Sequence, residues 1–232
     1  MTPAPSRAFF VTGTDTGVGK TTVTAALAAR LVRAGQRVAV LKPVETGCME
    51  TAAGLWAADA ELLRAAAGGT QSAEDTCVYR FRTPVAPAVA ARREGGAIRA
   101  AAIEARVAAL RDRRPDWLFV EGAGGLLVPV TEDLLMADLA ARLGLPLLIV
   151  ARDGLGTINH TLLTVEVARA RGLEIAGVIL SATSPDPGPG EQDNAGELAR
   201  LSAVPYLGRL AWIAAGTDPA ELAHAIDLAP LG

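Results

Sequence analysis

The feature that most constrains the fold is an alternation of short, mostly apolar runs with alanine-rich stretches of helical periodicity. Runs of strand length occur at residues 8–12, 37–44, 117–125, 146–151, 175–182 and 204–210, and helical patterns at 21–35, 58–67, 97–114 and 158–172. Strands that are apolar on both faces must be covered on both sides, so the pattern predicts a doubly wound α/β fold with a mostly parallel sheet. Since no internal repeat or domain boundary is visible, we expect one domain over residues 1–232. Residues 183–194, rich in Pro, Gly and Asp, are expected to form an exposed connection.

The turn after the first expected strand carries a phosphate-binding pattern, "VTGTDTGVGKTT" at residues 11–22. Its first glycine lies one residue too far from Gly19 for the common G-x-x-x-x-G-K-[ST] spacing. A strand, a glycine-rich turn and a helix start nevertheless place backbone N–H groups and the positive end of a helix dipole around an anion. The pattern predicts a P-loop nucleoside-triphosphate site formed by Gly13, Asp15, Gly17, Val18, Gly19, Lys20, Thr21 and Thr22.

Two carboxylates are placed to complete a magnesium site with Thr21. Glu121 ends the apolar strand "WLFVEGAGG", and Asp59 begins a helix after the second strand. Mg²⁺ prefers a few oxygen ligands together with the phosphates of the nucleotide, so these three residues would suffice. A solvated carboxylate at the sheet edge for Glu121, and a helix-dipole role for Asp59, are the alternatives.

Two further segments are candidates for binding anions. Lys42 follows buried strand residues and precedes Pro43, where it could stabilise charge on a transferred phosphoryl group or be an ordinary surface charge. Thr46, close behind it, could contact a substrate in the same cleft. "GLGTINHT" at residues 154–161 opens a helix whose first N–H donors suit a carboxylate, although a plain helix start fits as well. His160 is more consistent with a structural role.

Composition excludes several classes of partner. The formal net charge of −3 and the 4% of aromatic residues do not indicate nucleic-acid binding. The apolar runs are too short to span a membrane, and the N-terminal residues lack the pattern of an export signal. The two cysteines, Cys48 and Cys77, form no paired motif and suggest a cytoplasmic protein with free thiols. With two histidines, a zinc cluster is not expected.

Taken together, four motifs resemble the dethiobiotin synthetase family. They are "VTGTDTGVGKT", "LKPVETG", "VEGAGGLLVP" and "LGTINHTLLT", which occur in that order between residues 11 and 164, and the lengthened phosphate loop is itself a feature of the family. The resemblance implies an ATP-dependent ligase of biotin biosynthesis. An amine of 7,8-diaminononanoate (diaminopelargonate) captures CO₂ as a carbamate, ATP phosphorylates that carbamate, and the second amine closes the cyclic urea of dethiobiotin, releasing ADP and phosphate.

The resemblance also assigns roles to residues. It implies that Lys20, Lys42 and Thr16 act on the phosphoryl group and the carbamate, and that Pro84 and Pro87 belong to a lid over the substrate. It further implies Mg²⁺ on Thr21, Asp59 and Glu121, and a homodimer whose substrate site lies at the subunit interface. The implied substrate-binding residues are Thr16, Lys42, Thr46, Pro84, Gly124, Gly156, Thr157, Ile158 and Asn159.

One departure from the family pattern concerns the base of the nucleotide. Better-known members have Asn-Asp after the strand "AGVIL", where this chain has Ser181-Ala182. A hydroxyl cannot reproduce the paired donor and acceptor of an amide, so we expect a relaxed nucleotide preference in which CTP or another triphosphate can replace ATP. Gly17 also stands where some members have glutamate.

Two other functions share parts of this pattern. A corrin-type ATP-dependent amidoligase would usually carry an additional glutaminase domain. A partner-stimulated P-loop ATPase would have a second lysine in the loop, at the position that Asp15 occupies here.

Overall fold

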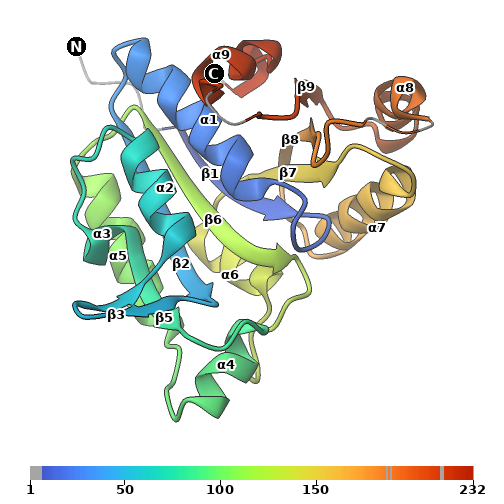
Figure 1. Ribbon diagram of the computed structural model, residues 1–232. Coiled ribbons are helices and arrows are strands. Elements are labelled where there is room, and N and C mark those ends of the chain that lie inside the picture. Colours follow the sequence, from blue (N-terminus) through green and yellow to red (C-terminus); the bar gives the residue numbers. More distant parts are fainter. Residues whose placement is uncertain (1–6, 187, 189, 215–216, 232) are drawn as a thin grey trace.

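The central sheet has seven parallel strands in the order β5–β2–β6–β1–β7–β8–β9 (Figure 1). The structure is a computed structural model that describes residues 7–186, 188, 190–214 and 217–231. The strands of the sheet are β1 (Arg7–Gly13), β2 (Val38–Thr46), β5 (Cys77–Phe81), β6 (Trp117–Gly125), β7 (Leu147–Arg152), β8 (Ile175–Ser181) and β9 (Tyr206–Leu210). A separate antiparallel hairpin consists of β3 (Met49–Thr51) and β4 (Gly54–Trp56).

Helices cover both faces of this sheet, which confirms the predicted doubly wound α/β class (Figure 1). The α-helices are α1 (Lys20–Arg33), α2 (Ala58–Ala66), α3 (Ala73–Thr76), α4 (Pro87–Arg93), α5 (Ala100–Asp112), α6 (Met136–Leu143), α7 (Thr157–Ala170), α8 (Glu191–Ser202) and α9 (Pro219–Leu222). Two short 3₁₀ turns, η1 (Ala223–Ala225) and η2 (Ala229–Leu231), follow α9. One core lies between the sheet and α1, α2 and the C-terminal turns, and the other between the sheet and α4 to α8.

Alternation along the strands decides which side chain enters which core. Val40 and Phe119 pack on the side of α1, whereas Leu41 and Val120, their neighbours in sequence, pack on the opposite side. Each is fully buried, and burial of such a side chain stabilises the fold by about 1.5–3 kcal/mol. This two-sided burial is why the strands read as continuous apolar runs.

The same alternation positions the polar residues at the strand ends. Leu41 on β2 is in register with Val120 on β6, so Lys42 and Glu121 follow side by side. Both belong to the set that alternates with Leu41 and Val120, and therefore face α1 and α2. The phosphate loop follows β1 at the same edge of the sheet, which is where open α/β folds bind ligands.

The structure departs from the predicted elements in several respects. Residues 183–194 were expected to be a loop throughout, but α8 already begins at Glu191, and Glu191 and Asn194 are buried; residues 187 and 189 lie outside the described residues. The sequence also gave no clear signal for β5 or α6. The edge strand β5 has a mixed composition, and α6 has only 8 residues. No helix in the described part of the chain is long and apolar enough to cross a membrane.

Candidate active site

The phosphate loop connects β1 directly to α1 and leaves the start of that helix open. Gly19 precedes α1 with φ at 91°, and α1 receives no side-chain cap there. A side chain at this position would be strained and would collide with the buried Ser181 at the end of β8. The unpaired N–H groups of the first helical turn are therefore available to an anion.

Lys20 is the first residue of α1 and is buried beside the loop. Its Nζ donates a hydrogen bond to the carbonyl oxygen of Asp15 at 3.1 Å. Burial lowers the pKa of Lys20 to about 8; Glu121 opposes this shift, and the neighbouring Lys42 adds to it. A phosphate arriving beside Lys20 would favour its charged form and raise that pKa.

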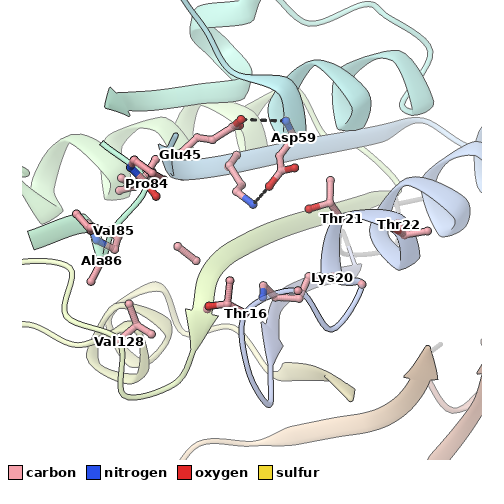
Figure 2. Close-up of a pocket in the computed structure, with 18 residues that line it drawn as sticks. Thr16, Lys20, Thr21, Thr22, Glu45, Asp59, Pro84, Val85, Ala86 and Val128 are labelled. Carbon is pink, nitrogen blue, oxygen red and sulfur yellow. Dashed lines mark hydrogen bonds and ion pairs between the residues drawn. The ribbon is translucent and has the colours of Figure 1, made fainter. Parts of the chain in front are cut away.

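Lys42 forms ion pairs with two carboxylates, those of Asp59 and Glu121; Figure 2 labels Asp59 beside Thr21. Its Nζ is 2.6 Å from Glu121 Oε1 and 2.7 Å from Asp59 Oδ2. Burial alone would lower the pKa of Lys42, but the two carboxylates outweigh it and raise that pKa above its usual range. In the same way Lys42 holds the pKa of Asp59 below its usual value, against the effect of burial. Lys42 is thus a buried amine whose charged form is stabilised by the two carboxylates.

The oxygen atoms at this point suit a divalent cation. Thr21 Oγ1 donates to Glu121 Oε1 at 2.6 Å, while Glu121 Oε2 is buried without a hydrogen-bond partner in the described part of the chain. The carboxylate of Asp59 is 46% exposed and faces the same point. An unsatisfied buried carboxylate oxygen beside a hydroxyl and a second carboxylate is a donor set of the kind that Mg²⁺ takes together with phosphate oxygens.

Glu45 is a buried carboxylate near this centre that sequence reasoning did not select. It is the next-to-last residue of strand β2 and accepts hydrogen bonds from the backbone N–H groups of Asp59 and Ala60, each at 2.9 Å. Burial raises the pKa of the Glu45 carboxyl, and these two hydrogen bonds oppose the shift. A glutamate inside "LKPVETG", between Lys42 and the turn, was the only signal that could have identified it.

These groups open into one cavity of about 590 Å³. Its polar end carries Lys20, Thr21, Lys42 and Asp59, and its remaining wall is mainly apolar. The predicted residues that it brings together are Thr16, Gly17, Gly19, Lys20, Thr21, Thr22, Lys42, Thr46, Asp59, Pro84, Pro87 and Gly124. Glu121 is buried behind them, in contact with Lys42. Ser181 is buried against Gly19 and does not line the cavity.

A second cavity of about 390 Å³ adjoins the first and shares Thr16 and Val128 with it. Its other side is the outer face of α7, including His160 and Leu163. Residues 156–159, predicted to bind a carboxylate, line neither cavity in the described part of the chain. Gly156 is the N-cap residue of α7 and residues 157–159 begin the helix, whose first turn is capped by no side chain in the described part of the chain.

Fold and site together define a P-loop nucleotide-binding protein. The sequence pattern described as "AAA domain" matches residues 7–220. Solved structures share the fold at low identity: chloroplast FtsY from Physcomitrella patens (TM-score 0.54, 19% identity, 97% of this chain and 66% of that chain) and the MinC:MinD complex from Aquifex aeolicus (0.56, 12%, 95% and 87%).

Closer sequence relatives identify the branch of this class. An ATP-dependent dethiobiotin synthetase BioD from Anaeromyxobacter dehalogenans (strain 2CP-C) is 48% identical over 89% of this chain and 90% of the relative. The protein of the same name from Anoxybacillus flavithermus is 43% identical over 88% and 91%. The chain therefore belongs to the ATP-dependent dethiobiotin synthetase family, as its four motifs predicted.

Proposed function

We propose that this chain catalyses ATP-dependent closure of the cyclic urea of dethiobiotin from 7,8-diaminononanoate and CO₂. The observation that carries the proposal is that one cavity is lined by both the phosphate loop and an apolar wall. The phosphate loop and Lys42 meet at its polar end, while Val44, Val85 and Val128 provide an apolar wall. Such a space suits a ligand with a charged, reacting end and an aliphatic chain.

The polar end accounts for the phosphoryl transfer. A neutral amine of the substrate forms a C–N bond to CO₂ and loses a proton, which gives a carbamate. A carbamate oxygen then attacks the γ-phosphorus of ATP, and ADP leaves. Lys20 and Lys42 would stabilise the negative charge that spreads over the transferring group, and Thr16 would hold the carbamate.

Ring closure depends on positioning and on the exclusion of water. The second amine attacks the carbonyl carbon of the carbamic–phosphoric anhydride, the C–O bond to phosphate breaks, and a proton is lost. Because this attack is intramolecular, effective molarities can reach about 10⁵ M or more. Thr46 and Gly124 would contact the diamine, and residues 84–87 would cover it and limit hydrolysis of the anhydride.

A magnesium ion would be held by Thr21, Asp59 and Glu121. When bound there, Mg²⁺ supplies charge neutralisation at the β- and γ-phosphates. The unsatisfied Glu121 Oε2 and the half-exposed carboxylate of Asp59 support this assignment.

The site would be completed by a second copy of the chain. Leu155, just before α7, is 86% exposed, and Leu163, on the outer face of α7, is 57% exposed. An apolar surface beside the substrate cavity supports a homodimer in which Gly156, Thr157, Ile158 and Asn159 of one subunit receive the substrate carboxylate of the other.

The base of the nucleotide would be selected weakly. Ser181 packs against Gly19, and its hydroxyl offers no amide pair to a base. ATP is the expected substrate, and we expect a relaxed preference in which CTP or another triphosphate can replace it. Titration of ATP, CTP and GTP at equal magnesium tests this, and a preference for ATP by orders of magnitude would contradict it.

The two alternative functions have less support. Eight relatives at 41–48% identity carry the name ATP-dependent dethiobiotin synthetase, which favours neither the corrin amidoligase nor the partner-stimulated ATPase. We also propose a cytoplasmic location, since Cys48 and Cys77 are free and buried.

A product assay tests the function directly. Purified protein, MgATP, 7,8-diaminononanoate and ¹³C-bicarbonate are incubated, and the products are read by mass spectrometry. Labelled dethiobiotin in equal amount with ADP is expected. Consumption of ATP without a labelled product would overturn the substrate assignment and leave the nucleotide site standing.

A further inference from the structure

The start of α2 is capped by a residue from another element. Ala57, which precedes the helix, has no side chain that can accept a hydrogen bond. Glu45 of β2 takes over this role: Oε1 accepts from the N–H of Asp59 and Oε2 from the N–H of Ala60, both at 2.9 Å. Figure 2 shows the Glu45 side chain reaching to the backbone of Asp59. Glu45 is only 6% exposed, so these bonds are shielded from water.

Strand β2 therefore holds Asp59 at two points. Lys42 contacts its carboxylate at 2.7 Å, and Glu45 contacts its backbone. The N–H groups in the first turn of a helix have no partner within the helix, so an acceptor that caps them stabilises that turn. The side chain of Asp59 is 46% exposed, so packing alone does not fix the direction of its carboxylate. That direction therefore also depends on the position of the backbone. The contact of Glu45 is to the backbone of Asp59, so it leaves the carboxylate free to bind a metal.

We propose that Glu45 is a positioning residue for the metal site: it fixes the first turn of α2 so that Asp59 faces Thr21 and Glu121. This inference rests on the proposed function, which places Mg²⁺ at those three residues. Glu45 acts through the backbone of Asp59 and need not touch the ion. Groups that orient metal ligands in this way change metal affinity by about 10- to 100-fold when they are replaced.

The experiment measures magnesium affinity without turnover. Melting temperatures are recorded with ADP in EDTA and with ADP over a range of Mg²⁺ concentrations, for the wild type, Glu45→Ala and Glu45→Gln. Ser72→Ala is the matched control, because Ser72 caps α3 through the N–H of Asp75 away from the site. In wild type, Mg²⁺ is expected to add to the stabilisation by ADP.

Glu45→Ala is expected to keep the stabilisation by ADP alone and to need about 10- to 100-fold more Mg²⁺ for the additional effect. Glu45→Gln retains the volume and one acceptor oxygen, so it remains folded and gives an intermediate value. Ser72→Ala is expected to have a lower melting temperature than wild type but the same dependence of that temperature on magnesium concentration.

Two results are informative in opposite ways. If wild type shows a magnesium effect and both Glu45 variants share its concentration dependence, Glu45 is an ordinary helix cap and the inference is overturned. If wild type itself shows no magnesium effect, the proposed metal site fails instead.

Discussion

At the scale of single residues, the site is organised around one buried ammonium group. Lys42 neutralises Glu121, which is fully buried, and Asp59, which is partly exposed. Isolated buried charges are very unfavourable, so each member of this group depends on the others. The same arrangement leaves a lysine in the cavity beside the phosphate loop, where we propose that it stabilises the transferred phosphoryl group.

Replacement of Lys42 should therefore affect both stability and rate. We expect Lys42→Met to lose roughly 3 kcal/mol of unfolding free energy, because Glu121 is left as an unpaired buried charge. We expect kcat to fall by about 10²- to 10³-fold. Urea unfolding in EDTA measures the first effect. The double variant Lys42→Met/Glu121→Gln should recover much of the stability but not the rate; a double variant no more stable than the single one contradicts the pairing.

A second prediction at this scale concerns Gly19. Gly19→Ala adds a side chain at φ 91° that meets Ser181, and we expect ATP affinity to fall by about 10- to 100-fold. Gly35→Ala is the matched control: its φ is 77°, but nothing lies within 4 Å of the added Cβ. It should lower stability and leave ATP binding unchanged. Calorimetric titration of both variants with ATP measures these affinities. Equal losses in the two variants would mean that the collision with Ser181 is not the cause.

At the scale of elements, ion pairs connect short helices to long ones. The carboxylate of Asp75 in α3 forms two ion pairs. Its Oδ2 lies 2.7 Å from Arg113 Nη2, and its Oδ1 pairs with Arg106 of α5. The α3 helix has only 4 residues and could not persist without such contacts. Hydrogen bonding from Arg113, aided by its charge and by Arg106, holds the pKa of Asp75 below its usual value.

This lowered pKa predicts a pH dependence of stability. A carboxyl whose pKa is lower in the folded state stabilises the fold above its unfolded pKa of about 3.9, and the contribution is lost as pH falls through the folded value. Asp75→Asn should cost about 1 kcal/mol at pH 7, and the difference from wild type should shrink below about pH 4. Asp112→Asn, at an exposed position on α5, should cost nothing. Urea unfolding at several pH values checks this, and a difference independent of pH would argue against the ion pairs.

At the scale of the whole molecule, two cavities share a wall. Thr16 and Val128 separate the cavity at the phosphate loop from the one that faces α7. The exposed Leu163 lines the second cavity. A second subunit seated there would enclose the open side of the substrate site.

The proposed dimer leads to the last prediction. We expect light scattering to show a dimer for the wild type. Leu163→Glu should be a monomer, because burying a charge in an apolar interface is unfavourable. This variant should also have a raised KM for 7,8-diaminononanoate. Leu201→Glu, on α8 and 43% exposed, should remain dimeric and active. A monomeric wild type with full activity would rule out a shared site.

The sequence alone predicted the fold class and the family, because both can be recognised from local sequence patterns. Apolar runs on strands and helical periodicity reflect burial on both faces of the sheet, and the phosphate loop is continuous in the chain. It also predicted that Asp59 and Glu121 hold Mg²⁺ together with Thr21, and it identified Lys42 as a candidate for stabilising a transferred phosphoryl group. The tertiary structure decided what these residues do to one another: the register of β2 with β6 places Lys42 beside Glu121, and α2 brings Asp59 to them. Glu45 was not identified because its role depends on a helix end that comes close only after folding. A contact between a side chain and the backbone of a distant helix end leaves no local pattern, so only the folded chain could reveal this one.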